Sequence, residues 1–129
     1  MGRFCAEHQW LQNFIGSDSG YDTHFKAIGD KYGPFNIALL ECGQYNTAWL
    51  YIHSMPEELI KEATELKASV TMPVHCAKLA LAMHNWDEPI KRFVKAADEA
   101  GIKYTTQLIG EPVILDERFP TSQWWLQVN

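Results

Sequence analysis

Short apolar runs alternate with stretches of helical pattern along this chain, and this alternation constrains its fold more than any other feature of the sequence. The apolar runs predict strands at residues 10–15, 37–40 and 69–74. Capping residues and apolar stripes predict helices at 22–32, 54–67 and 87–100, and a short helical piece at 78–83. Two further strands are predicted at 104–108 and 112–115. Strands that alternate with helices indicate an α/β layered domain.

Composition and charge narrow the class of protein. The 129 residues fit one domain, residues 1–129, and a hydrophobic content of 47% is enough for a packed core. A formal net charge of -5 provides no basic footprint, so no nucleic-acid partner is expected. No apolar run is long enough to span a bilayer, and the first residues lack the apolar region of a signal peptide. Three cysteines without a CxxC spacing suit a reducing compartment, so we expect a cytoplasmic protein.

A tight loop follows the first predicted strand, and it carries the carboxylate of Asp18 between Gly16 and Gly20. The pattern is similar to G-x-S-x-G, but its central residue is Asp, which excludes a serine nucleophile. An Asp off the end of a strand lies where α/β proteins place their chemistry. Three interpretations stay open at this point, namely a nucleophilic Asp, a metal ligand and an ordinary Asp-Ser-Gly turn.

Two histidines occupy comparable positions. His75 directly follows the predicted strand at 69–74, so it should reach the same sheet edge as Asp18. An Asp and a His at one edge can be metal ligands or an acid/base pair, although a single His after a strand is more often structural. His53 ends the loop 43–53, just before a helix start, where an anionic group of a substrate is favoured.

Two other segments have competing interpretations. The aromatic residues of the loop 43–53, Tyr45, Trp49 and Tyr51, can line a substrate pocket or belong to the core. The charged residues at the start of the helix 54–67 are expected to form a solvated face. They are Glu57, Glu58, Lys61 and Glu62.

A set of motifs, taken in order, resembles the C-terminal half of metallo-β-lactamase-fold hydrolases. The motifs are Gly16-Ser17-Asp18-Ser19-Gly20-Tyr21, His24-Phe25, Ile28-Gly29, Gly33-Pro34-Phe35, Ala38-Leu39-Leu40, Gly43-x-Tyr45, His53-x-x-Pro56-Glu57-Glu58 and Pro73-Val74-His75. The resemblance covers roughly residues 14–115 and is strongest to the branch of N-acyl-phosphatidylethanolamine phospholipase D and L-ascorbate-6-phosphate lactonase-like proteins. The resemblance implies half of an αββα sandwich, with a mixed sheet and flanking helices.

The resemblance also implies roles for individual residues. Asp18 is similar to the carboxylate that bridges two metals, and His75 to the last histidine ligand of the second metal. His53 is similar to a pocket histidine beside the substrate, so the implied catalytic residues are His53 and Asp18. His8, at the end of Phe4-Cys5-Ala6-Glu7-His8, is similar to a further ligand histidine. The implied cofactor is zinc, or another divalent metal such as manganese or iron. The implied reaction is attack by metal-bound hydroxide on a phosphodiester, lactone or related ester of a small molecule.

The departures from the family are equally informative. The His-x-His-x-Asp-His motif, which supplies most ligands in that family, is absent from this sequence. Asp18, His75 and His8 give three ligands, fewer than a two-metal site needs, so an incomplete site is expected. The sheet face that packs on the other half of the sandwich should be exposed, which predicts a homodimer or a complementing N-terminal half.

Two alternatives to a metal-dependent hydrolase stay open. One is a catalytically inactive, truncated remnant that acts through dimerisation or partner binding. The other is an Asp-nucleophile hydrolase in which Asp18 attacks and His75 is the base.

Overall fold

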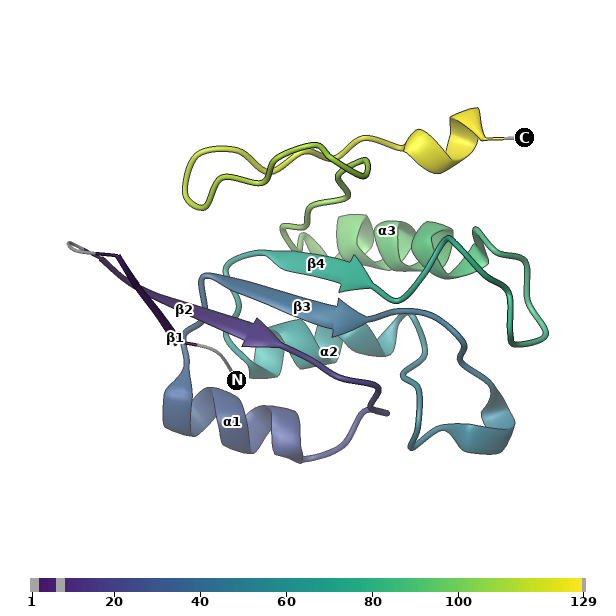
Figure 1. The fold of residues 1–129 in the computed structure, drawn as a ribbon. Coiled ribbons are helices and arrows are strands. Elements are labelled where there is room, and N and C mark those ends of the chain that lie inside the picture. The colour runs from purple at the N-terminus through teal and green to yellow at the C-terminus, as the bar shows by residue number, and fades with distance from the viewer. Residues whose placement is uncertain (1–2, 7–8, 129) are drawn as a thin grey trace.

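Four strands form one mixed sheet in the computed structural model, which describes residues 3–6 and 9–128. They are β1 (Arg3–Ala6), β2 (Gln9–Ile15), β3 (Ile37–Glu41) and β4 (Thr71–Val74), in the spatial order β1-β2-β3-β4. β1 and β2 pair antiparallel, whereas β2, β3 and β4 run parallel, with Phe14 opposite Ala38 and Leu40 opposite Pro73. The parallel strands therefore end at a common edge of the sheet (Figure 1).

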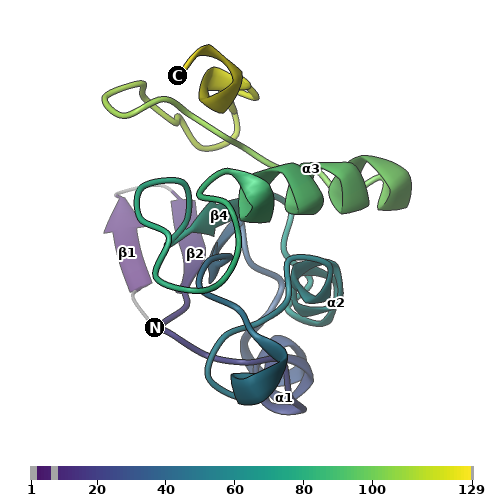
Figure 2. The same cartoon turned by 90° about the vertical axis from the view of Figure 1, so that its right-hand side faces the viewer.

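The three helices lie on one face of this sheet, as Figure 2 shows. They are α1 (His24–Tyr32), α2 (Glu58–Glu65) and α3 (Glu88–Ala100). The core forms between them and the sheet, where Phe14, Leu40 and Phe93 are buried. Side chains alternate along a strand, so the neighbours Ile15 and Leu39 face away from the helices, and Ile15 is exposed. The α/β fold with a mixed sheet and flanking helices confirms the prediction from the sequence.

Most of the predicted elements are present. The strands at 10–15, 37–40 and 69–74 correspond to β2, β3 and β4, and the three long helices correspond to α1, α2 and α3. The helix α3 ends where predicted, because Gly101 adopts the left-handed conformation with φ 68°. The strand β1, which pairs antiparallel with β2, was not predicted from the sequence. No helix among the described residues is both long and apolar enough to cross a membrane.

The short helical piece predicted at 78–83 is wrong. The side chain of Gln44 takes the backbone groups that such a helix would use. Its Nε2 donates to the carbonyl of Leu79 over 2.7 Å, and its Oε1 accepts hydrogen bonds from the amides of Leu81 and Ala82 over 2.8 and 2.9 Å. The segment is therefore an ordered loop that hydrogen bonds from the Gln44 side chain hold in place.

The two late strands, at 104–108 and 112–115, are also wrong. Only isolated bridges occur there, between Thr71 and Tyr104 and between Ile114 and Arg118. The amide of Thr105 donates to Thr71 O, and that of Thr106 donates to Pro120 O. Backbone hydrogen bonds are thus satisfied by different partners on successive residues, without a regular ladder.

Candidate metal centre

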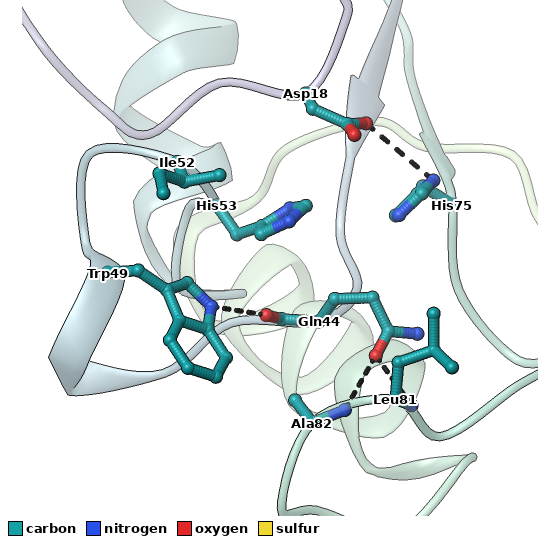
Figure 3. Close-up of a pocket in the computed structure, with 8 residues that line it drawn as sticks. All are labelled: Asp18, Gln44, Trp49, Ile52, His53, His75, Leu81 and Ala82. Atoms are coloured by element: carbon teal, nitrogen blue, oxygen red, sulfur yellow. Dashed lines mark hydrogen bonds and ion pairs between the residues drawn. The ribbon is translucent and has the colours of Figure 1, made fainter.

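Three side chains from three separate loops converge at the common edge of the parallel strands. Asp18 follows β2, His75 follows β4, and His53 ends the long loop after β3. One ligand atom from each residue lies within 4.8 Å of the others. His75 Nδ1 is 3.7 Å from Asp18 Oδ1, as the dashed line in Figure 3 marks. Parallel strands explain this meeting, because their C-terminal ends project loops toward the same side.

The backbone at His75 is held in an uncommon conformation. His75 has φ 60°, in the left-handed region that non-glycine residues seldom adopt. Its carbonyl oxygen lies against Gly43, at a place where a Cβ on residue 43 would overlap it. The close approach of Gly43 therefore lets the end of β4 turn and present the imidazole beside Asp18.

A buried carboxylate holds His53. Glu41 is the last residue of β3 and only 4% exposed, and its Oε2 lies 3.3 Å from His53 Nδ1. Its Oε1 accepts a hydrogen bond from the amide of Ser54 over 2.6 Å, and Gly43 N donates to Oε2 over 3.3 Å. Burial raises the pKa of Glu41 above its ordinary value, while the bonds from Ser54 and His53 oppose that rise. An N–H on Nδ1 that faces Glu41 leaves the lone pair of the ring on Nε2.

The exposure of the three side chains differs. The side chains of Asp18 and His75 are 57% and 41% exposed, whereas that of His53 is 14% exposed. The rings of His53 and His75 stack with centroids 5.6 Å apart and planes inclined by 16°. His53 thus forms the floor of the cluster, and Asp18 and His75 form its open side.

A cavity of about 330 Å³ opens beside the cluster. Its other walls come from the loop after β3 and from the loop that Gln44 holds. These lining residues are Gln44, Trp49, Ile52, Leu81 and Ala82 (Figure 3). Trp49 is fixed there, because its Nε1 donates to the carbonyl of Gln44 over 2.8 Å. The cavity therefore joins a polar corner to a mostly apolar wall.

The aromatic residues of this loop serve different purposes. Trp49 lines the cavity, and Tyr51 is exposed to solvent. Tyr45 belongs to the core, with its hydroxyl 2.5 Å from Glu88 Oε1, and burial together with Glu88 raises its pKa to about 12. The pocket interpretation therefore holds for Trp49, and the core interpretation holds for Tyr45.

The residues predicted from the sequence are largely brought together. Asp18, His53 and His75 meet, whereas His8 lies outside the described residues. Sequence reasoning missed Glu41, which bonds to His53, and Gln44, which bonds to the loop at Leu81. The signal was available for Glu41, since a charged residue directly after four apolar strand positions needs a partner if it is buried.

The cluster fits a divalent metal. One carboxylate and two imidazoles are the donor types that suit zinc, iron or manganese. Three protein ligands with an open side also match the usual count for a catalytic zinc. The set differs from the expected one, because His53 stands in the cluster as a third group beside Asp18 and His75.

Comparisons with known proteins identify relatives of this chain. No family model matches the chain. An uncharacterised protein of Mycobacterium tuberculosis is 36% identical over 115 residues, which are 87% of this chain and 31% of that protein. The mitochondrial N-acyl-phosphatidylethanolamine-hydrolysing phospholipase D of Saccharomyces cerevisiae is 31% identical over 94 residues, 70% of this chain and 20% of that protein.

A solved structure has a similar fold. Igni18, a metallo hydrolase of the archaeon Ignicoccus hospitalis, superposes with a TM-score of 0.59 at 20% identity over 83% of this chain and 41% of its own. The chain thus spans a third or less of the curated relatives described above and less than half of this structure. Its fold is that of the C-terminal half of a metallo-β-lactamase-fold hydrolase, as the motifs implied.

Proposed function

We propose that this chain, which has half of a metallo-β-lactamase fold, takes part in metal-dependent hydrolysis of a small-molecule ester or phosphodiester. The observation that carries the proposal is the convergence of Asp18, His53 and His75 within 4.8 Å at the mouth of a cavity. These three residues would hold the ion. Zinc is the metal that the donor set favours, and manganese or iron would also suit it.

The protein groups around this site have separable tasks. Asp18 and His75 are the exposed ligands, open to the substrate side, and His53 is the ligand that Glu41 orients. When bound, the ion would act as a Lewis acid on an ester oxygen and lower the pKa of a water molecule. Trp49 and Ile52 would exclude water from one side of the cavity and contact an apolar part of the substrate.

The cavity and the relatives support a proposal for the substrate class. Its volume of about 330 Å³ admits a small ester group together with part of an apolar chain. The relative from Saccharomyces cerevisiae hydrolyses N-acyl-phosphatidylethanolamine according to its name, which supports a phosphodiester. We therefore place phosphodiesters first and lactones second among the substrates of this site.

The test measures metal and activity in the same samples. The purified chain is loaded with zinc or manganese, and hydrolysis of a nitrophenyl phosphodiester and of a lactone is followed. Asp18→Asn, His53→Ala and His75→Ala should each lose metal and activity. His24→Ala is the matched control, because His24 is an exposed histidine at the start of α1, outside the cluster. Equal trace metal in wild type and all variants would refute the proposal, and a covalent ester trapped on Asp18 would favour the nucleophile instead.

A second candidate function rests on the uncovered sheet face. Ile15 is 50% exposed on the side of β2 away from the helices. We infer that a homodimer partner or a complementing N-terminal half covers this face and supplies further ligands. The inactive alternative is a remnant that only binds such a partner. Light scattering combined with the activity assay separates them, since an active dimer or complex supports shared ligands and an inactive one supports the remnant. A monomer with full activity would contradict both.

We also infer a cytoplasmic location. Among the described residues, Cys42 and Cys76 are free thiols, which suits a reducing compartment. Localisation of a tagged chain by microscopy or fractionation tests this inference, and recovery in an oxidising compartment would oppose it.

A further inference from the structure

A buried hydroxyl group lies between the two loops that carry Asp18 and His53. Ser54 is fully buried, and its Oγ is 2.9 Å from the carbonyl oxygen of Ser19. The same Oγ is 2.5 Å from Oε1 of Glu62, a residue of α2 that is only 2% exposed. Ser19 follows Asp18 and Ser54 follows His53, so one hydroxyl connects the neighbours of two candidate ligands.

The number of hydrogens available for these two contacts determines whether Glu62 is protonated. A serine hydroxyl has one hydrogen, and the carbonyl of Ser19 can only accept. If Glu62 were ionised, it too could only accept, and one of the two contacts of Ser54 Oγ would have no hydrogen. If Glu62 is protonated, it donates to Ser54 Oγ, and Ser54 donates to Ser19 O. Both distances are then satisfied, and no buried acceptor is left without a donor.

The surroundings of Glu62 favour the same state. Burial raises the pKa of Glu62 to about 8, and the hydrogen bond from Ser54 opposes the rise. None of the ion pairs among the described residues includes Glu62. The titratable groups that face it come from the last residue of β3 and the residue after it, from α2, from the start of α1 and from the residues just before α1, and nearly all are acidic or neutral. They are Glu41, Cys42, Glu58, Glu65, His24 and Tyr21.

The two loops also meet at a second point. Gly20 N donates to the carbonyl of Tyr51 over 3.2 Å, and a Cβ on Gly20 would overlap the backbone at Leu50 and Tyr51. The Ser19 carbonyl and the Gly20 amide belong to the same peptide group, so Ser54 and Tyr51 hold its two ends. Ser54 therefore holds the carbonyl end of the Ser19–Gly20 peptide, one residue after Asp18.

We propose that protonated Glu62 and Ser54 form a positioning pair, in which Glu62 donates to Ser54, and Ser54 donates to the Ser19 carbonyl and thereby fixes Asp18 relative to His53. Neither residue of the pair touches the substrate. The effect on metal binding rests on the function proposed above, whereas the proton on Glu62 does not.

The variants of Glu62 and Ser54 either keep the hydrogen-bonded link to Ser19 or remove it. Glu62→Gln keeps a donor and an acceptor of the same size, so zinc affinity should stay within about twofold of the wild type. Glu62→Leu and Ser54→Ala remove the link to Ser19, and zinc affinity should fall about tenfold, as for the loss of groups that orient metal ligands. Glu65→Gln is the matched control, because Glu65 lies on the same helix but accepts its hydrogen bond from Tyr21.

Two readouts keep the proposal independent of activity. Zinc affinity is measured by calorimetry on variants with the far-ultraviolet circular dichroism of the wild type. The urea midpoints of wild type and Glu62→Gln are then compared from pH 5 to pH 9 without metal. The advantage of the wild type should shrink as pH rises toward 8 and become constant above it.

The outcomes are distinct. A constant difference in midpoint between wild type and Glu62→Gln would show that Glu62 carries no proton when folded, and the pair would be refuted. Wild-type zinc affinity in folded Ser54→Ala and Glu62→Leu would refute the positioning role. If the wild type binds no zinc, the proposed function fails, while the comparison of midpoints still decides whether the pair exists.

Discussion

His75 Nδ1 lies 3.7 Å from Asp18 Oδ1, although the two residues follow strands that are not neighbours in the sheet. β3 separates β2 from β4, so both loops must bend over its end to meet. A metal held between these groups would bind the folded state only, and at a hundredfold excess over its Kd it would add about 2.7 kcal/mol to the free energy of unfolding. We expect zinc to raise the urea midpoint of the wild type, and a chelator to reverse the effect.

The matched variants make this prediction specific. Asp18→Asn and His75→Ala should unfold at the same midpoint with and without zinc. Asp116→Asn should respond like the wild type, since Asp116 lies in the C-terminal segment away from the cavity. A zinc effect of equal size in all four proteins would mean that the metal binds elsewhere.

Glu41 provides the second prediction. Its carboxylate accepts from Ser54 N and Gly43 N and contacts His53 Nδ1, all in a buried place. Glu41→Ala leaves these donors without an acceptor, which should cost about 1–3 kcal/mol of the free energy of unfolding per group left unsatisfied. Glu41→Gln keeps an acceptor for one or two donors and should cost less.

The measurement for Glu41 has two parts. Urea unfolding gives the free energy, and ¹⁵N shifts of the His53 ring give its tautomer. The wild type should carry its proton on Nδ1, and Glu41→Ala should show a mixture of tautomers. An unchanged tautomer in Glu41→Ala would mean that the carboxylate does not orient His53.

The third prediction is a pH dependence. The pKa of Glu62 is about 8 when folded, above the value near 4.3 in an unfolded chain. The folded state thus holds a proton that the unfolded state releases, so the stabilisation is complete below about pH 4 and is lost as pH rises to 8. The maximal slope is about 1.4 kcal/mol per pH unit. The difference in the free energy of unfolding between wild type and Glu62→Gln isolates this slope. A difference that rises with pH instead of falling would contradict the prediction.

The strands and helices could be predicted because local pattern and tertiary environment agree there. The apolar run at 37–40 is buried by helices on one face, and the left-handed Gly101 ends α3 as its position indicated. The segments 104–108 and 112–115 failed for the opposite reason. Their apolar residues Leu108 and Ile114 are exposed, so no packing supports a regular strand there.

The supporting acids of the site were harder to find. Glu62 was expected on a solvated face, but it is buried with Leu59, Ala63 and Leu66. The helical spacing of these residues places Glu62 in the apolar stripe of α2, so its side chain is buried despite its charge. The burial of Glu62 is tolerable only because Ser54 lies beside it, a partner eight positions earlier on the chain that the helical pattern does not reveal.

Positions 43 and 29 provide the last prediction, as a matched pair of glycines. A Cβ on Gly43 would overlap the carbonyl oxygen of His75, whereas a Cβ on Gly29 would overlap that of Glu65, between α1 and α2. Both Gly43→Ala and Gly29→Ala force elements apart, and each should lower the free energy of unfolding by about 1–3 kcal/mol. Only Gly43→Ala should also displace His75, so zinc affinity should fall in that variant and stay near the wild-type value in Gly29→Ala. Calorimetric titration of both folded variants decides, because an equal loss of affinity would show that general loosening, and not the place of His75, controls the site.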